Sequence, residues 1–262
     1  MPNPLTNRPV VLTDLDDTLF QTKRKMQQEW QITAQHIAAL DRTLMPRSFM
    51  TEEQFLLVQW LLQYADVIPV TARGTEEIKR VKLPFRSWAI TTHGAVIIDP
   101  NGHCDTAWQQ QICHAMHPYS QRLITLQQQI EQMMQQQKLN AWVRINYEYD
   151  DVPIYFVMKH RDSNHIAELY QFADELETLL DSEGFYIHRN GNNIAWIPTP
   201  IEKGKATAWL LDKLKRERGI FPILGMGDSL SDFSFMQLCN WFCIPQKSQF
   251  CDTIKQSIFG KA

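Results

Sequence analysis

The chain has 262 residues, of which 44% are hydrophobic and 21% are charged, and its formal net charge is -3. These values are typical of a folded protein with one large or two modest domains, and they exclude a disordered chain. A slightly acidic chain also lacks the positive charge with which proteins bind nucleic acid or anionic membranes, so we expect neither partner.

The sequence gives no sign of membrane insertion or secretion. It contains no apolar stretch of the roughly 18 residues that a membrane helix needs, and residues 1–9 lack the apolar region of a secretory signal. We therefore expect a cytoplasmic protein. Its five cysteines form an odd set without the paired spacing of metal ligands, which predicts reduced thiols.

Short apolar runs alternate with helical patterns in the first hundred residues, which favours βαβ units and a parallel sheet. The first strand is predicted at Val10–Thr13, and a helical stretch follows at about residues 23–40. Thr51-Glu52-Glu53-Gln54 has the pattern of a capping box that opens a helix through Tyr64. The next strand is predicted at residues 67–70.

The middle of the chain has a different character. A Gln-rich stretch at residues 109–137 carries apolar residues at helical spacing, which predicts a surface helix with a solvated face of glutamines. A second helix is predicted at residues 164–180. Alternating or apolar patterns predict strands at residues 142–149, 154–158, 185–188 and 194–197.

The last part of the chain returns to α/β alternation, with a helix at residues 202–218 and a buried strand at 221–226. We therefore expect the α/β fold class, with a Rossmann-like parallel-sheet core and an inserted α+β cap domain. The expected core comprises residues 1–106 and 198–262, and the expected cap comprises residues 107–197.

The most informative segment is Asp14-Leu15-Asp16-Asp17-Thr18, which follows an apolar run and so lies where a buried strand ends. Two carboxylates two positions apart can share one pocket there. One can attack phosphorus beside a bound metal, while the other gives a proton to the departing oxygen and later takes one from water. This pattern favours phosphoryl transfer, although Asp and Thr also form turns and helix N-caps.

Three further signals follow downstream. Thr71 ends a strand, so its hydroxyl and the following backbone amides could face an oxyanion. Lys203 opens a helix, where the dipole disfavours a cation unless an anion is bound. Asp228 and Asp232 lie four apart on the turn after a strand, and oxygen ligands of this kind suit Mg²⁺, so Asp14 and Asp228 are the predicted metal ligands.

With these four segments in this order, the chain resembles the haloacid dehalogenase-like superfamily of phosphohydrolases. The resemblance covers essentially the whole chain. An insert between the second and third motifs looks like the branch with an α/β cap, as in Cof-type and sucrose-phosphate phosphatase-like enzymes. The resemblance implies a Mg²⁺-dependent phosphatase that acts on a small phosphorylated metabolite, such as a sugar phosphate, and a cap that selects it.

The resemblance also implies roles for individual residues. Asp14 would be the nucleophile that forms an aspartyl-phosphate, and Asp16 the general acid and base. The expected catalytic residues are Asp14, Asp16, Thr71 and Lys203. The expected metal ligands are Asp14, Asp228, the carbonyl of Asp16 and, directly or through water, Asp232. The expected substrate-binding residues are Thr71, Ala72, Arg73 and Lys203.

Several alternatives stay open. A phosphomutase would use the same aspartyl-phosphate but pass the phosphoryl group to a second sugar hydroxyl. A non-catalytic phospho-accepting module would also combine acidic residues, Thr and Lys around Mg²⁺, although a general base beside the phospho-aspartate argues against it. His93 and Ser231 stand where many relatives have Asn, which leaves the position of the substrate open.

Overall fold

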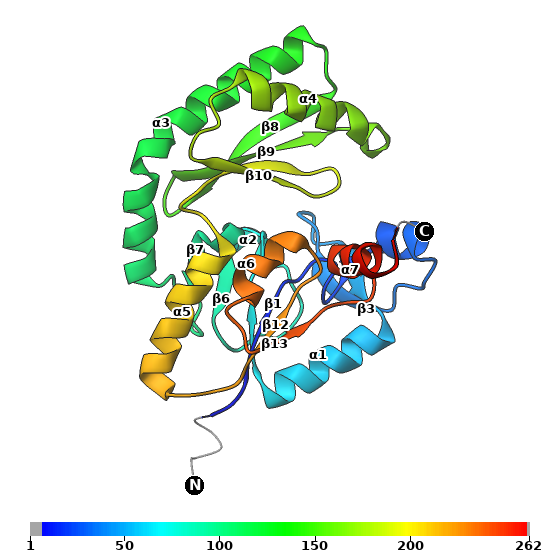
Figure 1. Ribbon diagram of the computed structural model, residues 1–262, viewed down its shortest axis with the longest axis vertical. Helices are drawn as coiled ribbons and strands as arrows, with labels where there is room; N and C mark the ends of the chain where they lie inside the picture. Colours follow the sequence, from blue (N-terminus) through cyan, green and yellow to red (C-terminus); the bar gives the residue numbers. More distant parts are fainter. Residues whose placement is uncertain (1–6, 261–262) are drawn as a thin grey trace. The chain divides into compact units, whose positions relative to one another are not determined.

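The computed structural model describes residues 7–260 and divides the chain into two compact units. The core unit combines residues 1–108 with residues 202–262, and the insert unit comprises residues 109–201. The core unit contains a parallel sheet and the insert unit an antiparallel one (Figure 1). The expected α/β fold class, with a Rossmann-like core and an inserted α+β domain, is confirmed.

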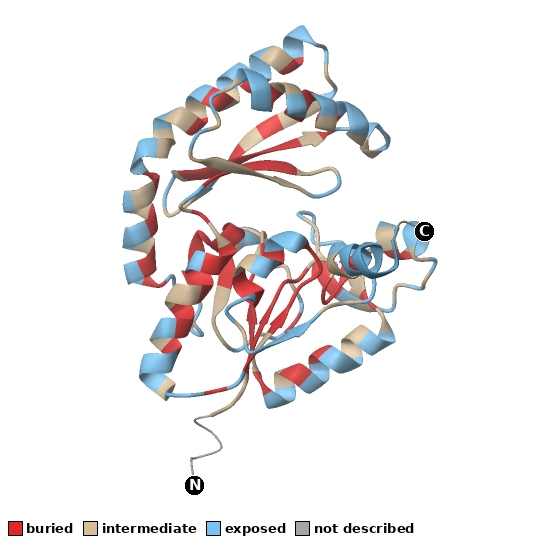
Figure 2. Ribbon diagram, in the orientation of Figure 1, coloured by how far each residue is buried: buried red, intermediate tan, exposed pale blue. Residues whose placement is uncertain are grey.

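Four parallel strands form the main sheet of the core unit, in the order β13-β12-β1-β5. Their bounds are β1 Val10–Thr13, β5 Asp66–Pro69, β12 Ile223–Met226 and β13 Trp241–Cys243. Strand β1 is buried along its whole length, because neighbouring strands flank it and other elements cover the sheet (Figure 2). A short hairpin of β6 (Ala89–Thr91) and β7 (Val96–Ile98) follows β5 in the chain.

The helices of the core unit follow the strands to which they are connected. Helix α1 spans Glu52–Tyr64 and begins with the predicted capping box, in which Thr51 and Gln54 each bond the other's backbone amide at 3.2 and 3.0 Å. Helix α5 spans Lys203–Arg218 and ends at Gly219, whose φ of 76° is accessible to glycine. The shorter helices are α2 Thr75–Ile78, η2 Thr92–Gly94, η4 Leu230–Asp232, α6 Phe233–Met236 and α7 Gln249–Phe259.

The helix expected at residues 23–40 is wrong. Strand β2 (Gln21–Thr22) leads into a short π-helix, η1 (Lys25–Glu29), and a left-handed residue, Gln31, follows with a φ of 55°. The chain then forms β3 (His36–Leu40), which pairs antiparallel with β4 (Pro46–Met50). Pairing of these strands and burial of β3 alanines override the local helical pattern, which is a weak preference.

The insert unit is an antiparallel sheet in the order β10-β11-β9-β8 with two long helices. Helix α3 spans Thr106–Gln136, so it begins in the core unit, and α4 spans Ile166–Leu179. The remaining elements are β8 Ala141–Glu148, β9 Val152–His160, η3 Ser163–His165, β10 Phe185–Arg189 and β11 Ile194–Pro198. Within residues 7–260, no helix is long and apolar enough to cross a membrane.

Candidate active site

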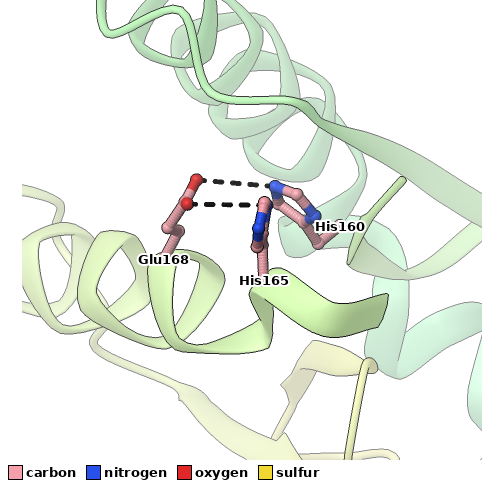
Figure 3. A group of neighbouring side chains, drawn as sticks. All are labelled: His160, His165 and Glu168. Atoms are coloured by element: carbon pink, nitrogen blue, oxygen red, sulfur yellow. Dashed lines mark ion pairs between the residues drawn. The ribbon is translucent and has the colours of Figure 1, made fainter. Parts of the chain in front are cut away.

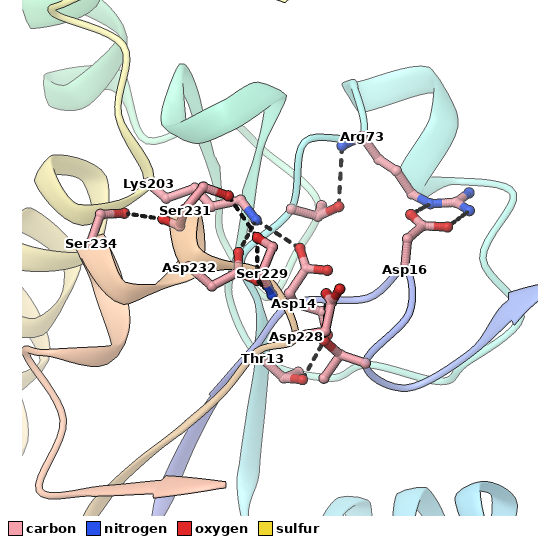
Figure 4. Close-up of polar contacts among 12 residues, drawn as sticks. Thr13, Asp14, Asp16, Arg73, Lys203, Asp228, Ser229, Ser231, Asp232 and Ser234 are labelled. Atoms are coloured by element: carbon pink, nitrogen blue, oxygen red, sulfur yellow. Dashed lines mark hydrogen bonds and ion pairs between the residues drawn. The ribbon is translucent and has the colours of Figure 1, made fainter. Parts of the chain in front are cut away.

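A cluster of polar side chains lies where β1 and β12 end (Figure 4). The backbone amide of Asp14 donates to the carbonyl of Met226 at 2.9 Å, and that of Val70 donates to Thr13 at 2.7 Å. The residues after β1, β5 and β12 are thereby brought to one edge of the sheet. This is the edge at which open parallel sheets bind ligands, because the strands end there and the following loops diverge.

Lys203 connects two acidic residues of this cluster. Its Nζ donates to Oδ1 of Asp14 and to Oδ1 of Asp232, both at 2.7 Å (Figure 4). All three side chains are buried, so each charge depends on the others for compensation. Burial alone would lower the pKa of Lys203, but the charges and hydrogen bonds of the two carboxylates outweigh it and raise this pKa.

Glycines allow Lys203 to reach this position. Gly94 has a φ of +100°, and a Cβ on it would lie 2.4 Å from the carbonyl oxygen of Glu202, immediately before α5. A Cβ on Gly204 would lie 2.5 Å from the carbonyl oxygen of Ser234. The first turn of α5 therefore packs against the backbone of η2 and of α6 at distances that only glycine permits.

Asp14, Asp228 and Asp232 form a buried acidic cluster, in which one ligand atom from each lies within 4.8 Å of the others. Burial, together with the charges of Asp232 and Asp228, raises the pKa of Asp14 well above its usual value despite Lys203. Burial, followed by the charges of Asp232 and Asp17, raises the pKa of Asp228 from 3.8 to about 7. Such an excess of buried carboxylate oxygens fits a hard divalent cation, which would relieve their repulsion.

Asp232 is held firmly in this cluster. Its Oδ1 accepts from Lys203, while its Oδ2 accepts from the backbone amide and the hydroxyl of Ser229, both at 3.0 Å. Ser231 bonds the same hydroxyl of Ser229 at 2.7 Å. The Asp232 carboxylate is thus oriented from both sides, and it positions Lys203 and the loop that carries Asp228.

The side chain of Asp16 lies apart from the acidic cluster. Its two carboxylate oxygens accept from Nε and Nη2 of Arg73 at 2.7 and 2.8 Å, and Figure 4 shows it turned away from Asp14 and toward Arg73. Burial alone would lower the pKa of Arg73, but the hydrogen bonds and charge of Asp16 outweigh burial and raise this pKa. The structure therefore brings together Asp14, Lys203, Asp228 and Asp232, and it pairs Asp16 with Arg73.

The loop after β5 carries the remaining predicted residues. The hydroxyl of Thr71, which is buried, accepts from the backbone amide of Arg73 at 3.1 Å, and Ala72 lies between them. The amides of Thr92 and His93 donate to the carbonyls of Arg73 and Thr71 at 2.7 and 3.1 Å. The turn at η2 thus fixes the loop in place from its other side.

Two residues that support the site were not among those predicted from sequence. Thr18, the last residue of the first motif, donates its hydroxyl to Oδ1 of Asp228 at 3.2 Å. Ser229 orients Asp232. The signal for Thr18 was its place in the motif, whereas Ser229 is an ordinary turn residue whose role depends on the fold.

The chain is similar to sucrose phosphatases in its sequence pattern and in its fold. The family model for sucrose-6F-phosphate phosphohydrolase matches residues 7–243. The sucrose-phosphatase of Synechocystis sp. PCC6803, whose structure contains sucrose and phosphate, is 14% identical with a TM-score of 0.53, over 98% of this chain and 90% of that one. A protein of Thermoplasma acidophilum is 12% identical with a TM-score of 0.51, over 94% and 88% of the two chains. No curated protein sequence matches.

Fold, site and family model together define a phosphatase of the haloacid dehalogenase-like superfamily. Within it, the chain belongs to the sucrose-6F-phosphate phosphohydrolase family, whose model matches all but the ends of the sequence. The expected resemblance and the expected enzyme class are thereby confirmed.

Proposed function

We propose that the protein is a Mg²⁺-dependent phosphomonoesterase that hydrolyses a sugar phosphate through an aspartyl-phosphate on Asp14. The observation that carries this proposal is the contact of Lys203 with both Asp14 and Asp232 beside Asp228, at the end of the central strands. Family membership supports the phosphatase activity and the sugar phosphate class.

Asp14 is suited to be the nucleophile. Lys203 holds its Oδ1, and its other oxygen makes no hydrogen bond among the residues that the structure describes. Attack by this oxygen on phosphorus forms the bond to Asp14 while the bond to the leaving oxygen breaks. The carboxylates of Asp14 and Asp228 and the backbone carbonyl of Asp16 would hold Mg²⁺, with Asp232 behind them. When bound, Mg²⁺ would offset the repulsion between Asp14 and the phosphate dianion.

Asp16 is the proposed acid and base. It would give a proton to the leaving oxygen in the first step and take one from the attacking water in the second, when the bond between Asp14 and phosphorus breaks. In the structure its carboxylate accepts two hydrogen bonds from Arg73. Asp16 can therefore act only after Arg73 releases it, and a phosphoryl or sugar oxygen that attracts Arg73 would free it.

The phosphoryl oxygens would be held by Lys203, the hydroxyl of Thr71 and the amide of Ala72. Arg73 would be the fourth contact once it leaves Asp16. Each group carries positive charge or a donor hydrogen, and all lie on the loops after β5 or on the first turn of α5. These donors suit the oxygens of the phosphoryl group in the transition state of its transfer, because those oxygens carry most of the negative charge.

The test is phosphate release from a panel of sugar phosphates, with sucrose 6-phosphate first because of the family, in the presence and absence of Mg²⁺. We expect turnover of at least one sugar phosphate with Mg²⁺. Asp14→Asn should lower it by at least about 10⁴-fold, as expected when a nucleophile is lost.

Asp212→Asn is the matched control, because Asp212 is an exposed carboxylate on α5, and it should keep full activity. An unchanged rate in Asp14→Asn would overturn the proposal. Isomerised sugar phosphate without free phosphate would instead assign a phosphomutase, and a stable phosphoprotein after incubation with acetyl phosphate would assign a phospho-accepting module.

A further inference from the structure

Three side chains that the proposed reaction does not use meet in the insert unit. His160 is the last residue of β9, His165 closes the short helix η3, and Glu168 lies in the first turn of α4. Nε2 of His160 lies 3.6 Å from Oε2 of Glu168, and Nδ1 of His165 lies 3.8 Å from Oε1 of the same carboxylate (Figure 3). One ligand atom from each residue lies within 4.8 Å of the others.

His160 is held rigidly and is buried. Its side chain is 0% exposed. Its backbone is held by the side chain of Asn192. The amide of His160 donates to Oδ1 of Asn192 at 2.8 Å, and the carbonyl of His160 accepts from Nδ2 of Asn192 at 2.7 Å. The imidazole therefore has a fixed position at the end of β9.

The hydrogen bonds of His160 leave a lone pair facing the cluster. Nδ1 lies 2.6 Å from the carbonyl oxygen of Asp162 and 3.1 Å from the backbone nitrogen of the same residue. The shorter contact joins two acceptors unless a hydrogen lies between them, so it favours the tautomer in which Nδ1 donates its hydrogen to the carbonyl. In this tautomer Nε2 is an acceptor, yet it is buried without a hydrogen-bond partner among the described residues. A histidine that donates through one nitrogen to a backbone carbonyl and presents the other, unpartnered, is the usual arrangement of a metal ligand.

We propose that His160, His165 and Glu168 bind a transition-metal ion, for which Zn²⁺ is the best fit. Two imidazoles and one carboxylate, with a fourth position left for water, form a common zinc donor set. Imidazole nitrogen also favours Zn²⁺ over the harder Mg²⁺, so this site differs in selectivity from the all-oxygen cluster around Asp14.

The observed distances need only a small adjustment. Ligand atoms around tetrahedral zinc lie roughly 3.3 Å apart, given bonds of about 2.0 Å, and two of the contacts are 3.6 and 3.8 Å. His165 and Glu168 are 56% and 57% exposed, so they can rotate toward the fixed His160 without disturbing the core. The ion would join the end of β9 to the start of α4.

The experiment measures Zn²⁺ binding to the full-length protein after removal of metals with EDTA, by competition with a chromophoric chelator. Excess Mg²⁺ is kept present to occupy the acidic cluster of the core unit. We expect one Zn²⁺ per chain. His165→Ala and Glu168→Gln should each weaken binding by more than about 10–100-fold, which is the usual loss when even an outer partner of a ligand is removed. Both residues are exposed, so the variants should fold.

His117→Ala is the matched control, since it removes an exposed histidine of α3 in the same unit, and it should bind Zn²⁺ as the wild type does. The visible spectrum of added Co²⁺ gives a second readout, because a four-coordinate site absorbs far more strongly than a six-coordinate oxygen site. Loss of that spectrum in His165→Ala would support the site. Equal Zn²⁺ affinity in wild type and both variants, or no binding by the wild type, would overturn it and leave an ion pair between His160 and Glu168.

Discussion

The buried carboxylate of Asp228 makes the stability of the metal-free protein depend on pH. Its pKa is raised from 3.8 to about 7 by burial and by the charges of Asp232 and Asp17. The folded, metal-free protein therefore binds a proton at Asp228 that the unfolded chain has already lost above pH 4 or so. This group makes its most favourable contribution to stability at low pH, and that contribution is lost as the pH rises toward 7.

We accordingly expect metal-free Asp228→Asn to be more stable than the metal-free wild type, because the amide never ionises. The difference in free energy of unfolding should grow by on the order of 2 kcal/mol between about pH 5 and pH 7. Urea unfolding in EDTA measures it. A difference that shrinks with rising pH would contradict the raised pKa of Asp228.

Asp16 provides a second prediction at this scale. Its side chain bonds Arg73 rather than joining the acidic cluster, so only its backbone carbonyl is expected near the metal. Asp16→Asn should lower kcat by about 10²–10⁴-fold, which is typical for a lost general acid or base, and change Mg²⁺ affinity little. Titration of Mg²⁺ by calorimetry checks this, with Asp228→Asn as the comparison. An equal loss of Mg²⁺ affinity in both variants would show that the Asp16 carboxylate is itself a ligand.

The sequence indicated Asp14, Asp228 and Asp232, because carboxylates that follow parallel strands are expected at the same edge of the sheet. It could not show that Arg73 holds Asp16, since the two residues are 57 positions apart and their contact depends on how two loops fold. Nor could it show that Ser229 orients Asp232. Local patterns predict which residue types stand at an edge, whereas the partner of each side chain is set by tertiary structure.

The first turn of α5 is the element on which the site depends most closely. Gly94 packs against the backbone of Glu202, next to Lys203, and a Cβ there would lie 2.4 Å from a carbonyl oxygen. Gly94→Ala should therefore move the start of α5, destabilise the protein by roughly 1–3 kcal/mol and lower activity, because its strained φ and the clash act together.

Gly102→Ala is the control for this prediction. Gly102 also has a left-handed φ, +87°, but a Cβ there would meet nothing within 4 Å. It should be destabilised by backbone strain alone and keep its activity. Urea unfolding and phosphate release measure both variants, and equal activity in the two would contradict a role for Gly94 in placing Lys203.

Helices with a clear hydrophobic periodicity or a clear capping residue were predictable from sequence, as α1 and α5 show. Residues 36–40 were not, because β3 is stabilised by pairing with β4 rather than by its own composition. Strand β13 was also missed. It has only three residues, and its place beside β12 at the edge of the sheet is set by tertiary pairing.

At the scale of the whole molecule, the division into two units predicts that a ligand stabilises the unit that binds it and leaves the stability of the other unit unchanged. Mg²⁺ at about 100 times its dissociation constant stabilises the unit that binds it by about 2.7 kcal/mol. Amides of the core unit that exchange through its unfolding should therefore exchange about 100-fold more slowly with Mg²⁺.

Hydrogen exchange followed by mass spectrometry can test this prediction by peptide. Peptides that cover β1 and β12 should be protected by Mg²⁺, and peptides that cover β8 and β9 should be unaffected. Asp228→Asn should abolish the effect. Equal protection of β8 and β9 would show that the two units unfold as one.

The central pairing of β1 with β12 joins segments that are far apart in the sequence, since Val10 lies beside Ile223. The insert unit, in contrast, is one continuous segment, residues 109–201. During synthesis on the ribosome, all residues of the insert unit are thus made before β12, the partner of β1, is made. The acidic cluster can therefore assemble only after β12 has been made and has paired with β1, which is later than the completion of the insert unit.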